Sequence, residues 1–262
     1  MLVFSAIVPH PPILIPALGQ ENLNLLKKTT EAMEKTAEKL LASNPETIII
    51  ISPHGPFLTN AFSLNIAPNF TLNFKTFGDI ETELQFMGDI GFGHQIKEAL
   101  ETKIPIQLIS QVNLDHGTGI PLYCLTKNLK NIKIIPLVYS DLDNQKHFEL
   151  GQKLADLIQH SKKRIAVIAS GDLSHALSND APAPYSEDGK IFDKTLIKMI
   201  EEKNNAGILN LDQTLIKNAV ECGLKSILIL LGILNDFNYA PEIYSYECPL
   251  GVGYLVCNLA IN

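Results

Sequence analysis

The stretch Thr47-Ile48-Ile49-Ile50-Ile51-Ser52-Pro53-His54-Gly55-Pro56 decides the fold class. Its four consecutive isoleucines are typical of a strand buried on both faces, as in a parallel sheet covered by helices. A turn containing Pro53, His54 and Gly55 follows at once. In open α/β sheets, ligands bind outside the carboxyl ends of the strands, so His54 is expected at a binding site.

Working outward, further apolar runs alternate with helical segments, which predicts an α/β fold. We expect one domain over residues 1–262, with a mixed, largely parallel central sheet flanked by helices. The predicted strands are Leu2–Val8, Thr47–Ile51, Phe62–Ala67, Thr71–Phe74, Ile104–Ile109, Ile132–Val138, Ile165–Ala169, Ile243–Tyr246 and Val252–Leu259. The predicted helices are Glu21–Ser43, parts of Glu81–Thr102, His116–Leu129, Asn144–Gln159, Glu187–Glu202, Asp212–Val220 and Leu224–Leu234, and Ser178–Gly189 is a loop.

Composition and charge argue against a nucleic-acid-binding, secreted or membrane protein. Hydrophobic residues make up 46% of the chain and the formal net charge is −7, so a positive footprint for nucleic acid is not expected. Met1–Leu18 lacks the basic start of a signal peptide, and Leu224–Leu234 is too short to span a bilayer. The four cysteines show no C-x-x-C spacing. We therefore expect reduced thiols and a cytoplasmic protein with no membrane partner.

Four of the seven histidines lie in short turns beside proline, glycine or serine. His10, His54 and His175 each follow a predicted buried strand, and His116 opens a predicted helix after Asp115. Histidine is the commonest metal ligand and the usual acid–base group near neutral pH. The pattern therefore predicts a metal or proton-transfer site. At a helix N-terminus, His116 is suited to a bound anion.

The other three histidines, His94, His147 and His160, lie in polar, helical surroundings and are expected at the surface. Two histidines and one carboxylate form the facial triad of non-haem Fe(II) oxygenases. The carboxylate candidates are Glu221, Glu247, Asp172 and Asp115, and spacing does not choose among them.

Taken in order, these motifs resemble the class III extradiol ring-cleaving dioxygenase superfamily, of the LigB type represented by the protocatechuate-cleaving β subunit. The resemblance spans nearly the whole chain. It rests on His10-Pro11-Pro12, Ser52-Pro53-His54-Gly55, Asp115-His116-Gly117, Gly171-Asp172-Leu173-Ser174-His175 and Glu221-Cys222-Gly223. The strongest local likeness is to members of the AmmeMemo group.

The resemblance implies a non-haem Fe(II) extradiol dioxygenase that opens a catechol-like or aminophenol-like ring with O₂. His10, His54 and Glu221 are then the iron ligands. His175 is the acid–base residue, and His116 lies near substrate and oxygen. A small aromatic diol and O₂ are the implied partners, and a homo-oligomer is left open.

Cys222 provides an alternative to Glu221, because Memo-type relatives carry a cysteine in the corresponding Cys-Gly. A thiolate ligand favours copper or zinc over iron. Two other functions therefore stay open: a Memo-like redox or binding protein without turnover, and a zinc-dependent hydrolase with Asp172 or Glu221 as base. The absence of H-E-x-x-H weighs against the hydrolase.

Overall fold

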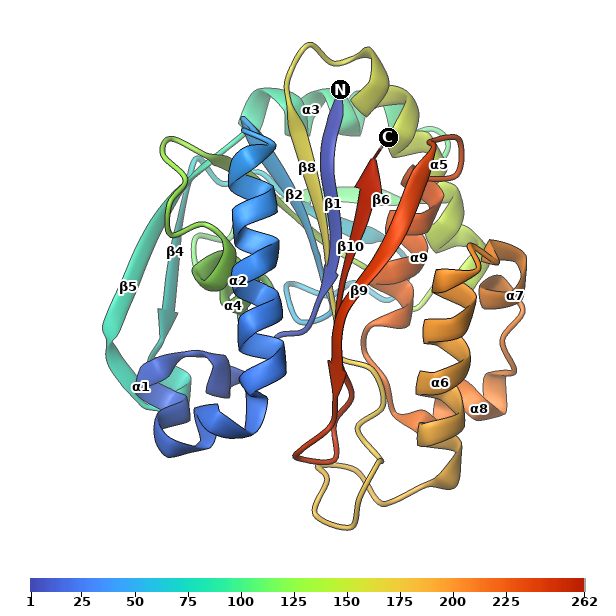
Figure 1. Ribbon diagram of the computed structural model, residues 1–262. Helices are drawn as coiled ribbons and strands as arrows, with labels where there is room; N and C mark the ends of the chain where they lie inside the picture. Colours follow the sequence, from blue (N-terminus) through green and yellow to red (C-terminus); the bar gives the residue numbers. More distant parts are fainter. Residues whose placement is uncertain (262) are drawn as a thin grey trace.

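The computed structural model describes residues 1–261, and ten strands in it form one mixed sheet (Figure 1). The main path runs β4-β5-β7-β2-β8-β1-β10-β9, while β3 pairs with β6 and β7. The strands are β1 (Leu2–Val8), β2 (Thr47–Ser52), β3 (Phe62–Asn65), β4 (Asn69–Phe74), β5 (Asp79–Gly88), β6 (Ile106–Ile109), β7 (Lys133–Val138), β8 (Ile165–Ser170), β9 (Tyr239–Glu247) and β10 (Tyr254–Ile261). Neighbours from β5 to β1 are parallel, whereas β4, β10 and β9 pair antiparallel. The predicted mixed, mostly parallel α/β sheet is therefore confirmed.

Helices cover both faces of this sheet. They are α1 (Pro16–Gly19), α2 (Lys27–Ala42), α3 (Ile90–Leu100), α4 (His116–Leu125), α5 (Asn144–His160), α6 (Glu187–Glu201), α7 (Asn205–Leu209), α8 (Gln213–Ala219) and α9 (Leu224–Ile233). Short 3₁₀ segments are η1 (Pro12–Leu14), η2 (Gln20–Leu26) and η3 (Lys75–Phe77). Helices α2 and α4 pack on one face, and α5 and α9 pack on the other (Figure 1).

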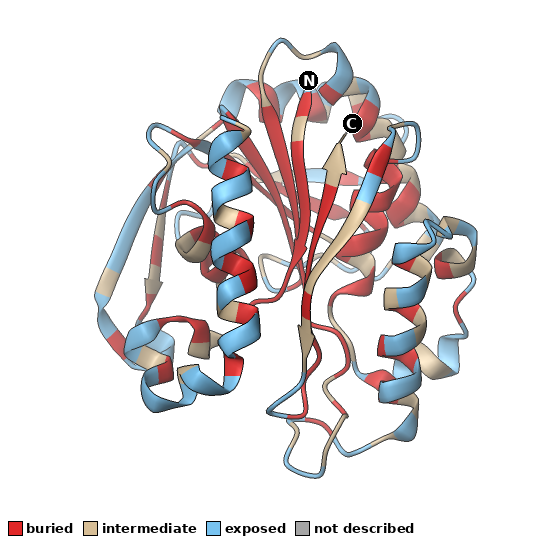
Figure 2. Cartoon of the chain, in the orientation of Figure 1, coloured by how far each residue is buried: buried red, intermediate tan, exposed pale blue. Residues whose placement is uncertain are grey.

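The isoleucine run shows why the sheet is buried on both sides. Ile48 and Ile50 of β2 join the core under α2 and α4, whereas Ile49 and Ile51 join the core under α5 and α9. This alternation follows from the two-residue period of a strand. All six residues of β2 are buried, and Figure 2 shows the central strands as mostly buried.

Two secondary-structure and burial predictions need correction. Residues 81–88 were expected to be partly helical, but they belong to strand β5, which pairs with β4 in a hairpin. The helix α3 begins only at Ile90. In β5, Ile80, Leu84 and Phe86 alternate with Glu81, Glu83 and Gln85, which is the two-residue period of a strand, although most of the strand is exposed.

His147 is the second correction, because it is fully buried rather than at the surface. Its Nδ1 donates to the Asp143 carbonyl at 2.7 Å, and its Nε2 accepts from the Ser140 backbone N–H at 3.4 Å. Burial lowers the pKa of His147 to about 4, so the ring is neutral and both nitrogens are used. His94 and His160 are exposed, as expected.

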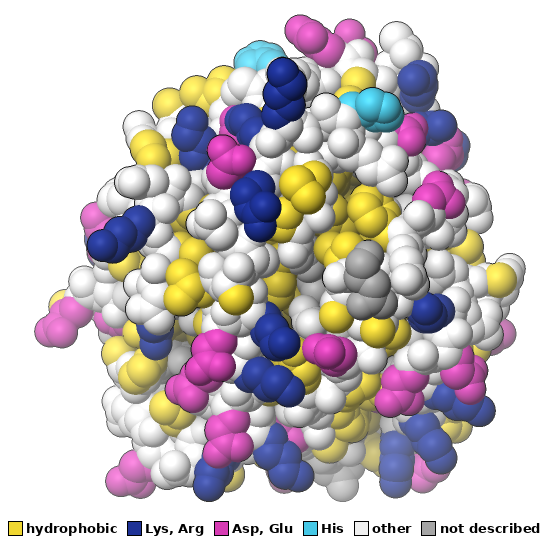
Figure 3. All heavy atoms as spheres, turned by 45° about the horizontal axis from the view of Figure 1, so that its top comes forward, with side chains coloured by type: hydrophobic (Ala, Val, Ile, Leu, Met, Phe, Trp, Pro, Cys, Tyr) yellow, Lys and Arg dark blue, Asp and Glu magenta, His cyan; other side chains and the backbone are white. Residues whose placement is uncertain are grey.

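The exterior carries mixed charges. On the face shown in Figure 3, Lys and Arg side chains are interspersed with Asp and Glu. Among residues 1–261, no helix combines the length and the apolar character that a bilayer span needs. The expectations about nucleic acid, membranes and cellular location remain predictions.

Two backbone segments come into unusually close contact where β8 ends and α9 begins. A Cβ on Gly171 would lie 2.2 Å from the Gly223 Cα, so only glycine allows this approach. The contact is reinforced by the Cys222 backbone N–H, which donates to the Asp172 carbonyl at 3.3 Å. Asp172 and Cys222 are thereby held side by side.

Replacing Gly171 with alanine should push these two segments apart. We expect Gly171→Ala to lower the free energy of unfolding by about 3 kcal/mol, as measured by urea denaturation. The matched control is Gly91→Ala in α3, where an added Cβ meets nothing within 4 Å. That variant should be unchanged or more stable by up to about 1 kcal/mol. Equal effects of the two substitutions would contradict the close contact.

Candidate metal centre

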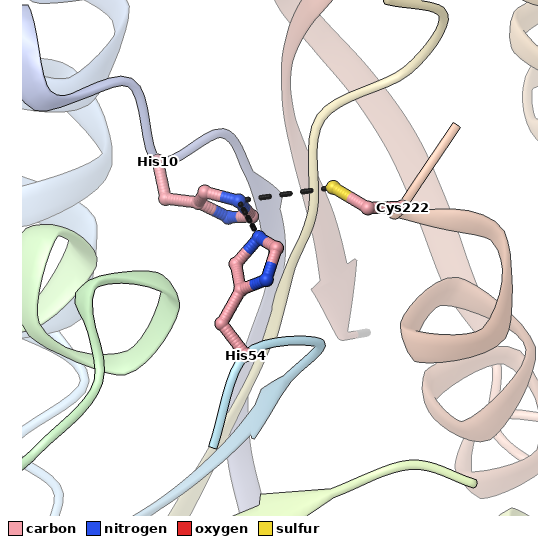
Figure 4. Close-up of side chains that lie close together, drawn as sticks. All are labelled: His10, His54 and Cys222. Carbon is pink, nitrogen blue, oxygen red and sulfur yellow. Dashed lines mark hydrogen bonds between the residues drawn. The ribbon is translucent and has the colours of Figure 1, made fainter. Parts of the chain in front are cut away.

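Three chain segments bring nitrogen and sulfur ligands to one point at the carboxyl ends of the parallel strands. His10 follows β1, His54 follows β2, and Cys222 precedes α9; Figure 4 shows their side chains pointing toward one another. His10 Nε2 lies 3.1 Å from His54 Nε2 and 3.7 Å from Cys222 Sγ. Within residues 1–261, these three are one of two groups that could hold a metal ion.

These spacings fit a shared cation. Two nitrogens each ~2.1 Å from one ion lie roughly 3.0–3.4 Å apart, and a sulfur at ~2.3 Å lies roughly 3.6 Å from either nitrogen. The observed separations of 3.1 and 3.7 Å agree with these values. The donor set of two imidazoles and one thiol therefore fits a transition metal.

A hydrogen-bond chain fixes the tautomer of His10. The Ser170 hydroxyl donates to the Gly117 carbonyl, so its oxygen must accept from His10 Nδ1–H at 2.9 Å. The lone pair of His10 is then on Nε2, which faces His54 and Cys222. Such an outer partner is the usual means of orienting a metal-binding imidazole.

Both imidazoles are kept neutral, which is the form that binds metals. Burial, followed by the nearby His116, lowers the pKa of His10 to about 3. Desolvation and then the adjacent His10 lower the pKa of His54 to about 3. His10 is only 2% exposed, whereas His54 lies at the exposed rim, so the centre is reached from the side of His54.

Asp115 holds the start of α4, and with it His116, close to His54. Its carboxylate caps α4 by accepting from the Thr118 backbone N–H at 2.9 Å, and it also accepts from the Ser52 hydroxyl at 2.6 Å. The β2 turn is thus tied to the start of α4, and the rings of His54 and His116 stack with centroids 4.2 Å apart. Phe77 packs edge-on against His116 at 5.4 Å. Burial lowers the pKa of His116, so this ring is also kept neutral.

Asp172 lies between His10 and His175. Its Oδ1 accepts from the His10 backbone N–H at 2.9 Å, and its Oδ2 lies 3.8 Å from His10 Nε2 and 3.9 Å from His175 Nε2. His175 Nδ1 donates to the Val220 carbonyl at 2.7 Å, which leaves its Nε2 lone pair facing Asp172. Burial raises the pKa of Asp172 to about 6. The Asp172 carboxyl can therefore carry a proton at mildly acidic pH.

Asp172 and His175 also form the second of the two possible metal-binding groups, again with Cys222. The thiol is thus shared by both groups. Burial, followed by the nearby Asp172, raises the pKa of Cys222 well above its ordinary value. Without a cation beside it, the side chain is a protonated thiol.

Glu221, the third ligand expected from the family resemblance, is directed elsewhere. Its Oε2 accepts from the Leu224 backbone N–H at 2.6 Å at the start of α9, and it is in neither of the two ligand groups. Burial raises the pKa of Glu221 to about 7. Glu247 is also committed elsewhere, because it accepts from the Thr29 backbone N–H and hydroxyl at 2.7 Å.

The family described as "Catalytic LigB subunit of aromatic ring-opening dioxygenase" matches residues 5–257. The chain belongs to the LigB family.

Three curated proteins that resemble this chain carry different descriptions. They are protein CA_C1420 of Clostridium acetobutylicum, at 32% identity over 97% of this chain; a MEMO1 family protein of Methanosarcina mazei, at 26% over 75%; and 4,5-DOPA dioxygenase extradiol of Beta vulgaris, at 28% over 60%. The alignments cover 56%, 66% and 58% of those proteins, so this chain spans less than two thirds of their lengths.

A solved structure supports the fold. The uncharacterized protein JW3007 of Escherichia coli K12 superposes with a TM-score of 0.71 over 98% of this chain and all of that one, at 19% identity. The two chains therefore share one fold.

In this LigB-family chain, a buried carboxylate outside the candidate metal centre holds the segment that carries His175. Asp193 of α6 is 1% exposed; its Oδ1 accepts from the Ser174 backbone N–H at 2.8 Å and its Oδ2 from the Tyr246 hydroxyl at 2.6 Å. Burial raises the pKa of Asp193 to about 6. The sequence offered no signal for this residue beyond its place in an amphipathic helix.

The raised pKa of Asp193 predicts a pH effect on stability. Between its unfolded value of 3.8 and about 6, the folded chain holds a proton that the unfolded chain has lost. The contribution of Asp193 to the free energy of unfolding therefore falls as pH rises through this window. Asp193→Asn removes that dependence, so from pH 4 to pH 7 it should gain about 2 to 3 kcal/mol relative to the unsubstituted chain.

Urea denaturation of the metal-free protein at several pH values measures this difference. The control is Asp212→Asn, because Asp212 caps α8 through the Leu215 backbone N–H and lies on the surface. A constant difference between Asp193→Asn and the parent protein across this pH range would contradict the assigned pKa.

Proposed function

We propose that this chain is a metal-dependent dioxygenase that opens a catechol-like or aminophenol-like ring with O₂. The observation that carries the proposal is the meeting of His10 Nε2 and His54 Nε2 at 3.1 Å, in a chain of the LigB family. The name of the Beta vulgaris relative, an extradiol dioxygenase, supports the same reaction class. The substrates are then a small aromatic diol and O₂.

In this proposal His10, His54 and Cys222 hold the metal ion, with Fe(II) as the metal for ring opening. When bound, the ion would supply Lewis-acid and redox chemistry for the reaction of the diol with O₂. The contact between His10 Nε2 and Cys222 Sγ at 3.7 Å favours Cys222 over Glu221 as the third ligand, because the Glu221 carboxylate caps α9.

His175 is the proposed base for the substrate hydroxyl. Its Nε2 carries a lone pair that can accept the hydroxyl proton, since Nδ1–H is held by the Val220 carbonyl, and the Asp172 carboxylate 3.9 Å away stabilises the imidazolium that forms. His116, stacked on His54 at the rim, is placed to bind an anionic oxygen of the substrate. Phe77 at 41% exposure offers an apolar edge for an aromatic ring.

A second candidate function is favoured by the thiol in the centre. A thiolate ligand suits copper or zinc better than iron, and one relative is a MEMO1 family protein. The chain would then bind metal without ring-opening turnover. Identifying the third ligand and the metal therefore separates the two functions.

The third ligand is tested with two neighbouring substitutions. Cys222→Ser should lower metal affinity by at least about 100-fold, because it removes a ligand rather than an outer group. Glu221→Gln should change affinity by less than about threefold, because the glutamine oxygen can still accept from Leu224. Competition titration with a chromogenic chelator measures both. The reverse order of effects would restore Glu221 as the ligand.

Turnover is tested by anaerobic Fe(II) loading followed by oxygen uptake over a panel of catechols and aminophenols. Uptake with at least one ring is expected. His10→Ala should lose both metal and uptake. His175→Ala should keep the metal and lose about 10²- to 10⁴-fold in rate, as expected for a general acid–base group.

Full iron occupancy without uptake across the panel would count against the dioxygenase. Bound copper lost in Cys222→Ser would then favour the binding protein. Ester or amide hydrolysis by the zinc-loaded protein would favour a hydrolase instead.

A further inference from the structure

A cavity of about 720 Å³ lies apart from the metal centre, between α6 and the end of β9. Figure 1 shows these two elements side by side at the edge of the sheet. None of the residues of the two metal-binding groups lines it. Its volume falls within the range of small-molecule sites, which is ~300–1,000 Å³.

The cavity has an apolar interior. Leu177, Ile197 and the ring of Tyr246 are among its walls, and all three are partly buried. The Tyr246 hydroxyl donates to the buried Asp193 at 2.6 Å, so this part of the wall is held in place. A wall fixed in this way lowers the cost of ordering the site when a ligand binds.

The rim is basic. Lys190, Lys194 and Lys198 line the cavity at intervals of four residues, which places them in one row along α6. Lys198 lies 3.7 Å from Glu202, whereas the ion pairs found within residues 1–261 include neither Lys190 nor Lys194. Glu201 is the acidic residue of the lining. On a chain of net charge −7, a row of lysines over an apolar cavity selects for negative charge.

We propose that this cavity binds a small amphiphilic anion, with an apolar body against Leu177, Ile197 and Tyr246 and a carboxylate or phosphate group at Lys194. The two parts of the lining match the two parts of such a ligand. The metal centre takes no part in this binding, so the proposal stands independently of the ring-opening reaction.

Calorimetric titration of the full chain with decanoate, below its micelle-forming concentration, tests the proposal. Saturable binding at one site is expected. Decyltrimethylammonium, which has the same tail and the opposite charge, should bind at least tenfold more weakly. Lys194→Glu should weaken decanoate binding at least tenfold. Lys28→Glu makes the same charge change on the exposed side of α2 and should leave it within twofold.

Equal binding of the two surfactants, or equal affinities of the two lysine variants, would overturn the proposal. The same holds if decanoate shows no saturable binding. Sedimentation of the chain with phosphatidylglycerol vesicles, in the absence of decanoate binding, would assign the lysine row to a lipid surface and would also overturn it.

Discussion

The candidate metal centre depends on the contact between Gly171 and Gly223, where two backbones approach more closely than any side chain would allow. One side of that contact continues from β8 and carries Asp172, and the other leads into α9 and carries Cys222. Their mutual hydrogen bonds, from Cys222 N–H to the Asp172 carbonyl and from Asp172 N–H to Cys222 Sγ at 3.3 Å each, fix the thiol beside β1. Without this approach, Cys222 would not be held beside His10.

Packing on both faces of the sheet explains why the ligands converge at one edge. Parallel β1, β2 and β8 end together, so the residues that follow them share a small volume. That volume is desolvated, which keeps His10 and His54 neutral and raises the pKa values of Asp172 and Glu221. The imidazoles gain folding stability as pH rises and the carboxyl groups lose it, so the two contributions oppose each other around pH 4–6.

Much of this arrangement could be predicted from the sequence, because buried parallel strands have a clear apolar signature. The Ile48–Ile51 run located β2, and the turns after it and after β1 located His54 and His10. The strand β5 was missed although Ile80, Leu84 and Phe86 alternate with polar residues, because its Glu and Leu residues also favour helix. The burial of His147 could not be predicted either, because its hydrogen-bond partners are backbone groups of Asp143 and Ser140, which the sequence pattern does not identify.

The directions of the Glu221 and Cys222 side chains were the hardest part to predict, for a physical reason. Glu221 and Cys222 are adjacent, so the sequence places both at the start of α9 and does not show which side chain points toward His10. Their directions differ because the first turn of a helix leaves backbone N–H groups without partners. The Glu221 carboxylate satisfies one of them at Leu224, and Cys222 is left facing His10. Helix capping thus decides which side chain reaches the centre, and a thiol near two neutral imidazoles ionises only when a cation is present. With Cys222 as the proposed third ligand, metal binding should release a proton and strengthen as pH rises.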